Sequence, residues 1–339
     1  MTGNFVIGIA GTAKNTGKTT ALSALLGEIR KEPGPMTALT SIGYDGEHFD
    51  NITGLPKPRI SVERDEILAV AERCLHSGGA HLEVLEKTDI PTPLGKIVIG
   101  RVTRPGKIVL AGPNNRRDLA RVIDRFTGLG AGLTIVDGAL SRIAPLVVAQ
   151  ALLLCTGAAR NSDVELLAAE TRLVVDILKT PALEEQGPTA HLASVLNQAG
   201  FDRFVDAVQN FETVHLDGLF SELYYFKFLE EAGPLAGKRL IFADAIKLLL
   251  SGNAEATHRL LGRLRSKGLR VGVNAGLNLA AVTVNPYYPK YRYDLKEYEA
   301  TYVDKDELQA RVAAGLTAPV FDVVRQGGRG IYEALLGNQ

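Results

Sequence analysis

Tryptophan is absent from this chain of 339 residues, and cysteine and methionine occur only twice each. The two cysteines, Cys74 and Cys155, lie far apart and lack metal-ligand spacing. This pattern excludes a disulfide framework, and we expect two buried thiols in a reducing compartment. No run of eighteen or more apolar residues is present, and the N-terminus lacks the basic and apolar regions of a secretion signal. The sequence therefore predicts a cytoplasmic protein with no membrane partner.

Net charge is also missing, because Lys and Arg together number 38 and so do Asp and Glu. Without a basic surplus, nucleic acid is not expected as a partner. The six histidines show neither H-x-x-x-H nor H-E-x-x-H spacing, so we expect no histidine metal site. Apolar side chains are plentiful at 46% of the residues, which is enough for a well-packed core.

Short apolar runs bounded by Gly or Asp recur along the chain and alternate with segments of helical periodicity. Such runs are typical of strands buried on both faces of a mostly parallel sheet that helices flank, so the sequence predicts an α/β fold. Strands are expected at 4–10, 37–42, 96–102, 107–112, 133–138, 151–157, 213–218, 239–244, 269–276 and 280–286. Helices are expected at 19–31, 62–76, 115–127, 162–179, 189–199, 201–210, 244–250 and 254–267.

Two segments interrupt this alternation. Arg104, Pro105 and Gly106 predict a turn that folds residues 96–112 into a β-hairpin insertion. The segment 179–190 contains two prolines, a glycine and two glutamates and is the best candidate for a domain boundary. We therefore expect an N-terminal domain at 1–183 and a second α/β unit at 184–339.

The stretch "IAGTAKNTGKTTAL" (9–22) has the order of a phosphate-binding loop: an apolar strand, a glycine-rich turn, Gly-Lys-Thr and an amphipathic helix. Lys18 would reach the β- and γ-phosphates of a nucleotide, and Thr19 would ligate Mg²⁺. The alternative is a plain strand-to-helix turn in which Lys18 is solvated. The predicted nucleotide-binding residues are Gly11, Thr12, Lys14, Asn15, Thr16, Gly17, Lys18, Thr19 and Thr20.

Three acidic residues are candidates to assist this loop. Asp137 ends the apolar run of "LTIVDGAL" and is predicted to hold Mg²⁺, although an Asp-Gly turn is the simpler interpretation. Asp45 and Glu47 in "TSIGYDGEHFD" are candidates for orienting the attacking water, Asp45 also for binding Mg²⁺, and the alternative is a loop of solvated acids. No N-K-x-D guanine motif follows Asp137, which favours ATP without excluding GTP.

The early position of Gly11 matches a known class. Five residues separate Gly11 from Gly17 where the common pattern has four. "GTAKNTGKT" resembles the loop of dethiobiotin synthetase and related deviant P-loop enzymes, which carry G-T-x-x-x-x-G-K-T. Lys14 lies one position later than the signature lysine of the K-G-G-x-G-K pattern, which it otherwise resembles.

Several segments between residues 5 and 165 together resemble the small P-loop subunit of lysine 5,6-aminomutase reactivase. They are "GTAKNTGKTT", "TSIGYDGE", "TDIPTPLGKIVIGRV", "GKIVLAGP", "IVDGAL" and "TGAARNSD". The run after "VDGAL" departs from that family, and only Arg142 keeps its basic character.

The resemblance implies a P-loop NTPase fold and a Mg²⁺-dependent ATPase that acts as a chaperone. Nucleotide hydrolysis would open an adenosylcobalamin-dependent aminomutase so that damaged cofactor is exchanged. The implied partners are the aminomutase and a second reactivase subunit, in a homo- or hetero-oligomer. The alternative is an ATP-dependent ligase or kinase resembling dethiobiotin synthetase, with its metabolite near 45–50 or 112–117. A GTP-binding metallochaperone is less favoured, since Cys/His clusters are missing.

Two further segments carry open interpretations. "TVNPYYPKYRYDLKEYEATYV" holds six of the ten tyrosines and is either a docking surface or a proline-kinked loop. Arg116 and Arg117 begin a helix that Asn114 or Asn115 caps. They either form a surface helix face, or one of them binds phosphate or a partner carboxylate.

Overall fold

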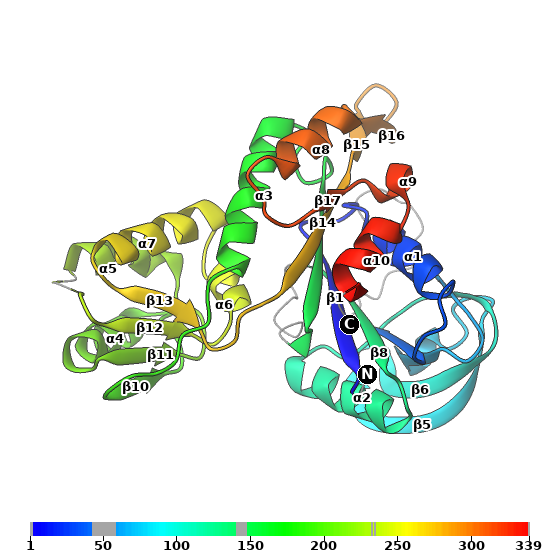
Figure 1. Cartoon of the computed structure of the whole chain (residues 1–339), viewed down its shortest axis with the longest axis horizontal. Helices are drawn as coiled ribbons and strands as arrows, with labels where there is room; N and C mark the ends of the chain where they lie inside the picture. Colours follow the sequence, from blue (N-terminus) through cyan, green and yellow to red (C-terminus); the bar gives the residue numbers. More distant parts are fainter. Residues whose placement is uncertain (1–2, 43–58, 140–147, 232, 234, 338–339) are drawn as a thin grey trace. The chain divides into compact units, whose positions relative to one another are not determined.

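The computed structural model describes residues 3–42, 59–139, 148–231, 233 and 235–337 (Figure 1). They form two units. The first unit combines Met1–Ala168 with Leu279–Gln339, and the second unit is Ala169–Asn278. The first unit is therefore discontinuous in sequence, with the second inserted into it.

A nine-stranded sheet forms the first unit, in the order β17-β14-β9-β1-β8-β2-β4-β6-β5. Its pairs are parallel from β17 to β4, whereas β4–β6 and β6–β5 are antiparallel. This confirms the predicted α/β class with a large, mostly parallel sheet. The strands are β1 (Phe5–Gly11), β2 (Thr37–Ser41), β4 (Ile67–Ala71), β5 (His81–Thr92), β6 (Gly95–Arg104), β8 (Leu133–Ala139), β9 (Ala151–Gly157), β14 (Leu279–Asn285) and β17 (Val320–Phe321).

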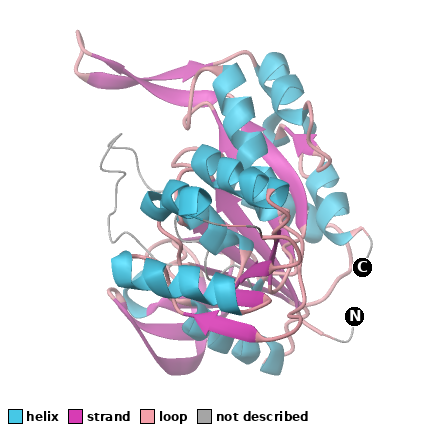
Figure 2. Ribbon diagram, turned by 90° about the vertical axis from the view of Figure 1, so that its left-hand side faces the viewer, coloured by secondary structure: helices cyan, strands magenta, loops and turns pink. Residues whose placement is uncertain are grey.

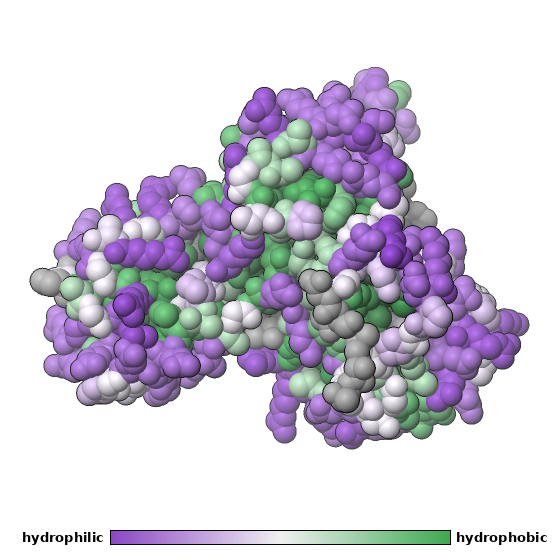
Figure 3. Space-filling model, in the orientation of Figure 1, coloured by the Kyte–Doolittle hydropathy of each residue, from purple (hydrophilic) through white to green (hydrophobic). Residues whose placement is uncertain are grey.

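Helices flank this sheet and bury their apolar faces on it. Leu22, Leu25 and Leu26 of α1 are at most 1% exposed and share one core cluster with Ile7 and Ile9 of β1. Burial of each such leucine stabilises the fold by about 1.5–3 kcal/mol. On the face of the molecule drawn in Figure 3, hydrophilic residues cover most of the surface. The helices are α1 (Lys18–Ile29), α2 (Arg116–Gly128), α8 (Lys305–Ala313), α9 (Val323–Gln326) and α10 (Arg329–Leu336), and α3 (Val164–Leu178) contains the sequence boundary to the second unit.

The prediction of a hairpin at 96–112 is wrong, because the hairpin forms one strand earlier in the chain. β6 pairs with β5 through a turn at Thr92–Gly95, in which Gly95 has φ 96°. β7 (Gly106–Ile108) pairs instead with β3 (Ile60–Val62). The strand character of β5 was hidden by Pro91, which the sheet tolerates because β5 is its edge strand.

Two segments that were predicted to be helices contain strands instead. The segment 62–76 contains β4, all five residues of which are buried, followed by a short 3₁₀ helix at Glu72–Cys74. The segment 189–199 begins with β10 (Thr189–Leu192). Short apolar runs fit buried strands and buried helices equally well. Burial in the sheet explains β4, whereas the partly exposed β10 forms by pairing with β11.

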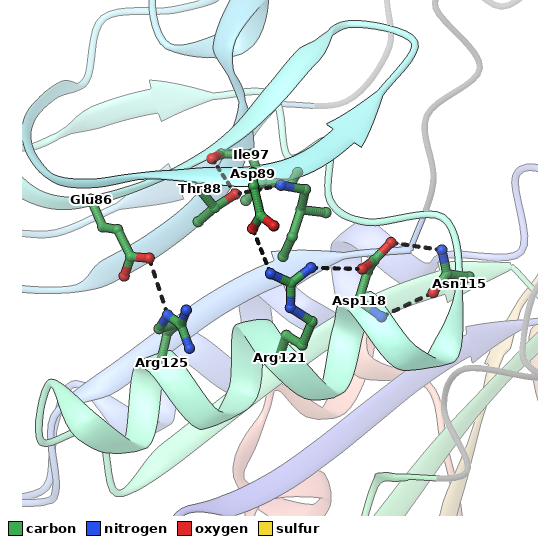
Figure 4. A network of polar contacts seen from close by, with 9 residues as sticks. Glu86, Thr88, Asp89, Ile97, Asn115, Asp118, Arg121 and Arg125 are labelled. Atoms are coloured by element: carbon green, nitrogen blue, oxygen red, sulfur yellow. Dashed lines mark hydrogen bonds and ion pairs between the residues drawn. The ribbon is translucent and has the colours of Figure 1, made fainter.

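A polar network attaches α2 to the outer strand β5 (Figure 4). Asn115 caps the helix by accepting from the Asp118 N–H at 2.9 Å, which confirms the predicted cap. Arg121 pairs with Asp89, and Arg125 Nε lies 3.0 Å from Glu86 Oε1. The hydrogen bond from Arg121 holds the pKa of Asp89 below its ordinary value. These exposed pairs orient the helix more than they stabilise it.

The second unit is a four-stranded parallel sheet, β10-β11-β12-β13, with aromatic packing at its centre. The ring of Phe204 lies 4.8 Å from those of Phe220 and Phe228. Its remaining elements are β11 (Thr213–Leu216), β12 (Arg239–Phe242), β13 (Arg270–Val273), α4 (Gln198–Asn210), α5 (Tyr225–Glu231), α6 (Ala245–Leu250) and α7 (Ala254–Ser266).

These boundaries differ from the division expected at residue 183. Residues 279–339 join the first unit, because β14 pairs in parallel with β9. The proline-containing segment 179–190 belongs to the second unit, where the buried Arg239 donates to the carbonyl of Glu184 at 3.1 Å. Among the described residues no helix combines the length and the apolar character that a membrane crossing requires.

Candidate functional site

A glycine-rich loop, residues 12–17, connects β1 to the N-terminus of α1. Gly17 (φ 88°) and Asn15 (φ 62°) both adopt left-handed backbone. Glycine takes this conformation freely, and asparagine tolerates it better than most residues. Lys18 begins α1, whose first turn leaves N–H groups without partners inside the helix. The loop therefore ends at a positively polarised helix terminus.

Gly11 leaves space that the loop uses. A Cβ at this position would lie 2.7 Å from Thr16 Oγ1 and 2.8 Å from both Cγ and Cδ of Lys18. The Lys18 side chain therefore passes directly over the end of β1. Any side chain at position 11 would collide with Thr16 and Lys18, so the structure itself requires glycine here.

Threonine hydroxyls hold the loop in place. Thr12 donates its N–H to the Cys155 carbonyl at 2.9 Å and its hydroxyl to Thr156 Oγ1 at 3.1 Å. The buried Thr16 donates its hydroxyl to the Ala13 carbonyl at 2.9 Å. These contacts give Thr12 and Thr16 a role in shaping the loop. Of the other predicted binding residues, Lys14, Asn15 and Thr20 are exposed and Thr19 is half-buried.

Asn285, at the end of β14, was not identified from the sequence. Its Nδ2 donates to the Asn15 carbonyl at 2.8 Å, and its own carbonyl accepts from the Ala158 N–H at 2.9 Å. A Cβ at Gly17 would lie 3.2 Å from Cβ of Asn285. The only sequence signal was the start of the "NPYYPKYRYD" segment, which gave no reason to connect it with a loop 270 residues earlier.

Asp137 lies beside this loop, near the end of β8. Its register partner on β1 is Ile9, two residues before Gly11, so its side chain shares the sheet face that packs against α1. Oδ1 of Asp137 is buried and has no hydrogen-bond partner among the described residues. Burial raises the pKa of Asp137, and the charge of Lys18 and the Gly138 N–H counteract this only in part.

Cys155 lies on β9, the other neighbour of β1. Its thiol is fully buried, and burial raises its pKa to about 12 despite a hydrogen bond with Thr283. Cys74 is also buried, and burial raises the pKa of its thiol. Neither thiol is a nucleophile in these surroundings, in agreement with two buried small side chains.

The structure thus brings Lys18 and Asp137 together at the glycine-rich loop, with Thr19 on the first turn of α1. Asp45, Glu47 and Arg142 lie outside the described residues. Within the described ranges no group of three or more His, Cys, Asp or Glu side chains could hold a metal ion. The hydroxyl of Thr19 and the carboxylate of Asp137 are oxygen donors of the type that Mg²⁺ takes from proteins in small number, with phosphate and water completing its shell.

Comparisons with family models, with curated proteins and with solved structures found no match to this chain.

Proposed function

We propose that this chain is a Mg²⁺-dependent nucleoside triphosphatase that binds its nucleotide on the glycine-rich loop. The observation that carries the proposal is the buried, unpartnered Oδ1 of Asp137 in the electrostatic field of Lys18. A buried carboxylate oxygen without a donor is costly, and it persists where a ligand supplies the missing partner. A hydrated cation beside an anionic ligand supplies such a partner.

In this proposal catalysis depends on position and charge. Lys18 and the N–H groups of the loop and the first turn of α1 bind the phosphates, because both carry positive charge toward them. Thr19 and Asp137 hold Mg²⁺, which neutralises phosphate charge when bound. Asp45 or Glu47 orients the attacking water. ATP is the favoured nucleotide, because no guanine-recognition motif follows β8 in the sequence.

The cellular role in the proposal is that of a reactivase subunit for an adenosylcobalamin-dependent aminomutase such as lysine 5,6-aminomutase. It is supported by the six motif segments spread along residues 5–165, and the glycine-rich loop is one of them. Hydrolysis would release loops that the γ-phosphate and Mg²⁺ hold, and so shift an interface with the mutase between two states.

The test is phosphate release from ATP and from GTP, with and without Mg²⁺, in the presence and absence of an inactivated aminomutase and its second reactivase subunit. We expect Mg²⁺-dependent hydrolysis that the mutase stimulates, together with recovery of mutase activity. Stimulation by a small carboxylate or amine instead of the mutase would assign the ligase or kinase alternative. No Mg²⁺-dependent turnover under any of these conditions would contradict the triphosphatase itself.

Replacing Asn285 tests how the loop is held. Asn285→Ala removes the donor to the Asn15 carbonyl, and one such hydrogen bond is worth about 1 kcal/mol. We therefore expect nucleotide affinity to fall about fivefold, measured by calorimetric titration. The matched control is Asn253→Ala, which removes a helix cap that accepts from the Ala256 N–H in the second unit. Equal nucleotide affinity in the two variants would show that Asn285 does not position the loop.

A further inference from the structure

The tyrosine-rich segment forms an antiparallel hairpin of β15 (Tyr287–Arg292) and β16 (Glu297–Tyr302), directly after Asn285 and Pro286. It is a separate two-stranded sheet that extends away from the helices of the first unit (Figure 2). A two-stranded hairpin is marginally stable by itself unless one of its faces is covered. The described residues leave both faces of this hairpin largely exposed.

The pairing register separates its side chains into two unlike faces. Tyr287 pairs with Tyr302 and Tyr291 with Tyr298, with ring centroids 5.8 Å and 5.1 Å apart. Since alternate residues share a face, the tyrosine face carries no charged side chain at all. It consists of Tyr287, Pro289, Tyr291, Tyr293, Tyr298, Ala300 and Tyr302.

The opposite, charged face neutralises itself. Arg292 donates to Asp294 at 2.9 Å and 3.0 Å and to Glu299 at 2.9 Å. The hydrogen bonds from Arg292 to Asp294 hold the pKa of Asp294 below its ordinary value. Lys290 and Glu299 also face each other across the strands. The hairpin therefore offers little field to attract nucleic acid, an anionic membrane or an acidic peptide.

We propose that the tyrosine face is a dimer interface that packs on the same face of a second copy of this chain. An uncharged face needs an uncharged counterpart, and the chain itself supplies one that a twofold axis makes self-complementary. Pro289 removes an N–H from β15, which disfavours pairing along that strand edge and favours stacking face to face. Tyrosine suits such a contact, because its ring is apolar and its hydroxyl finds an acceptor at the rim.

The size of the face sets the strength of the dimer. Tyr291, Tyr293, Tyr298 and Tyr302 are exposed by 38%, 85%, 38% and 65%. With about 200 Å² for each ring system, two copies would bury roughly 900 Å² of tyrosine surface. This lies below the roughly 1,600 Å² of a standard stable interface, so we expect a weak dimer that forms and dissociates in the micromolar range.

Sedimentation velocity across the micromolar range tests the proposal without nucleotide. For the native chain we expect the weight-average mass to rise with concentration. The double variant Tyr291→Ser with Tyr298→Ser should remain a single chain, while Lys290→Ser with Glu297→Ser on the charged face should associate like the native chain. A native chain of single-chain mass at all concentrations would assign the face to a different protein and overturn the proposal, as would association that the tyrosine variant leaves unchanged.

A second readout does not depend on removing the tyrosines. Ala300→Cys places a thiol on the tyrosine face, and Thr301→Cys places one on the charged face. Both native cysteines are buried, so they add little background. A bifunctional maleimide should join two copies of the Ala300→Cys variant and leave the Thr301→Cys variant as single chains. Equal cross-linking of both variants, or of neither, would contradict a dimer through the tyrosine face.

Discussion

Lys18→Ala should reduce nucleotide hydrolysis by about 10²- to 10³-fold, the effect of removing one preorganised charge from a transition state. The side chain of Lys18 passes over Gly11 at the N-terminus of α1, where phosphate charge would be concentrated. Alanine is a good helix former, so the variant should fold and keep α1. Steady-state phosphate release and the melting temperature, measured on the same sample, separate lost chemistry from lost structure.

The matched control for this variant is Lys31→Ala. Lys31 follows α1 on the exposed surface, 2.6 Å from Glu28, so its removal should change neither hydrolysis nor stability by a measurable amount. If Lys18→Ala and Lys31→Ala hydrolyse nucleotide at the same rate, the glycine-rich loop is a structural turn. That result would also remove the basis for the reactivase role.

Asp137→Asn should act in opposite directions on stability and on activity. The amide keeps the shape of the carboxyl and removes the buried charge, so the ligand-free chain should become more stable, with a melting temperature about 2–4 °C higher for each 1 kcal/mol gained. Hydrolysis should fall by about 10- to 100-fold, because an amide oxygen is a poorer ligand for Mg²⁺. Gains in stability at the expense of activity are typical of functional sites.

The pH dependence has a definite sign. Burial raises the folded-state pKa of Asp137 above its unfolded value, so the protonated form favours folding. This contribution is fully present below the unfolded pKa and is lost as the pH rises through the raised folded pKa. The stability advantage of Asp137→Asn over the native chain should therefore grow across that window. Binding of Mg²⁺ with nucleotide to the native chain should tighten over the same window, since the ionised carboxylate is the ligand.

Calorimetry at several pH values checks this, with Asp322→Asn as the control. Asp322 is buried and caps α9, where it accepts from the Val324 N–H at 3.1 Å. Asparagine is an equally good cap, so the control should gain no stability and keep full hydrolysis. An Asp137→Asn protein that is less stable than the native chain, or equally active, would contradict the proposal that Asp137 binds Mg²⁺ and destabilises the ligand-free chain.

Local patterns predicted the central part of the fold well. The strand β1, the loop and α1 follow from one apolar run, two glycines and leucines at helical spacing, all within 25 residues. Asp137 was identifiable because it ends a buried run, which places it at the same sheet edge as the loop. The α/β class followed for the same reason, since buried parallel strands leave continuous apolar runs.

The remainder depended on contacts between distant segments. Asn285 is polar and follows an apolar run in the same way as several other residues, and only the β9–β14 pairing brings it to the loop. The segment 62–76 has an apolar run that suits either element type, and its place next to β2 and β6 made it a strand. The tyrosines were visible in the sequence, but the register that gathers them on one face required the structure.

The nested order of the two units has a consequence for biosynthesis. β9 leaves the ribosome long before its neighbour β14, with the whole second unit, Ala169–Asn278, translated in between. At about 5–20 residues per second, this edge of the nascent sheet stays unpaired for on the order of ten seconds. The glycine-rich loop likewise waits for Asn285 before it is held. Early termination after the second unit would therefore release chains with an open strand edge, a recognised start of aggregation.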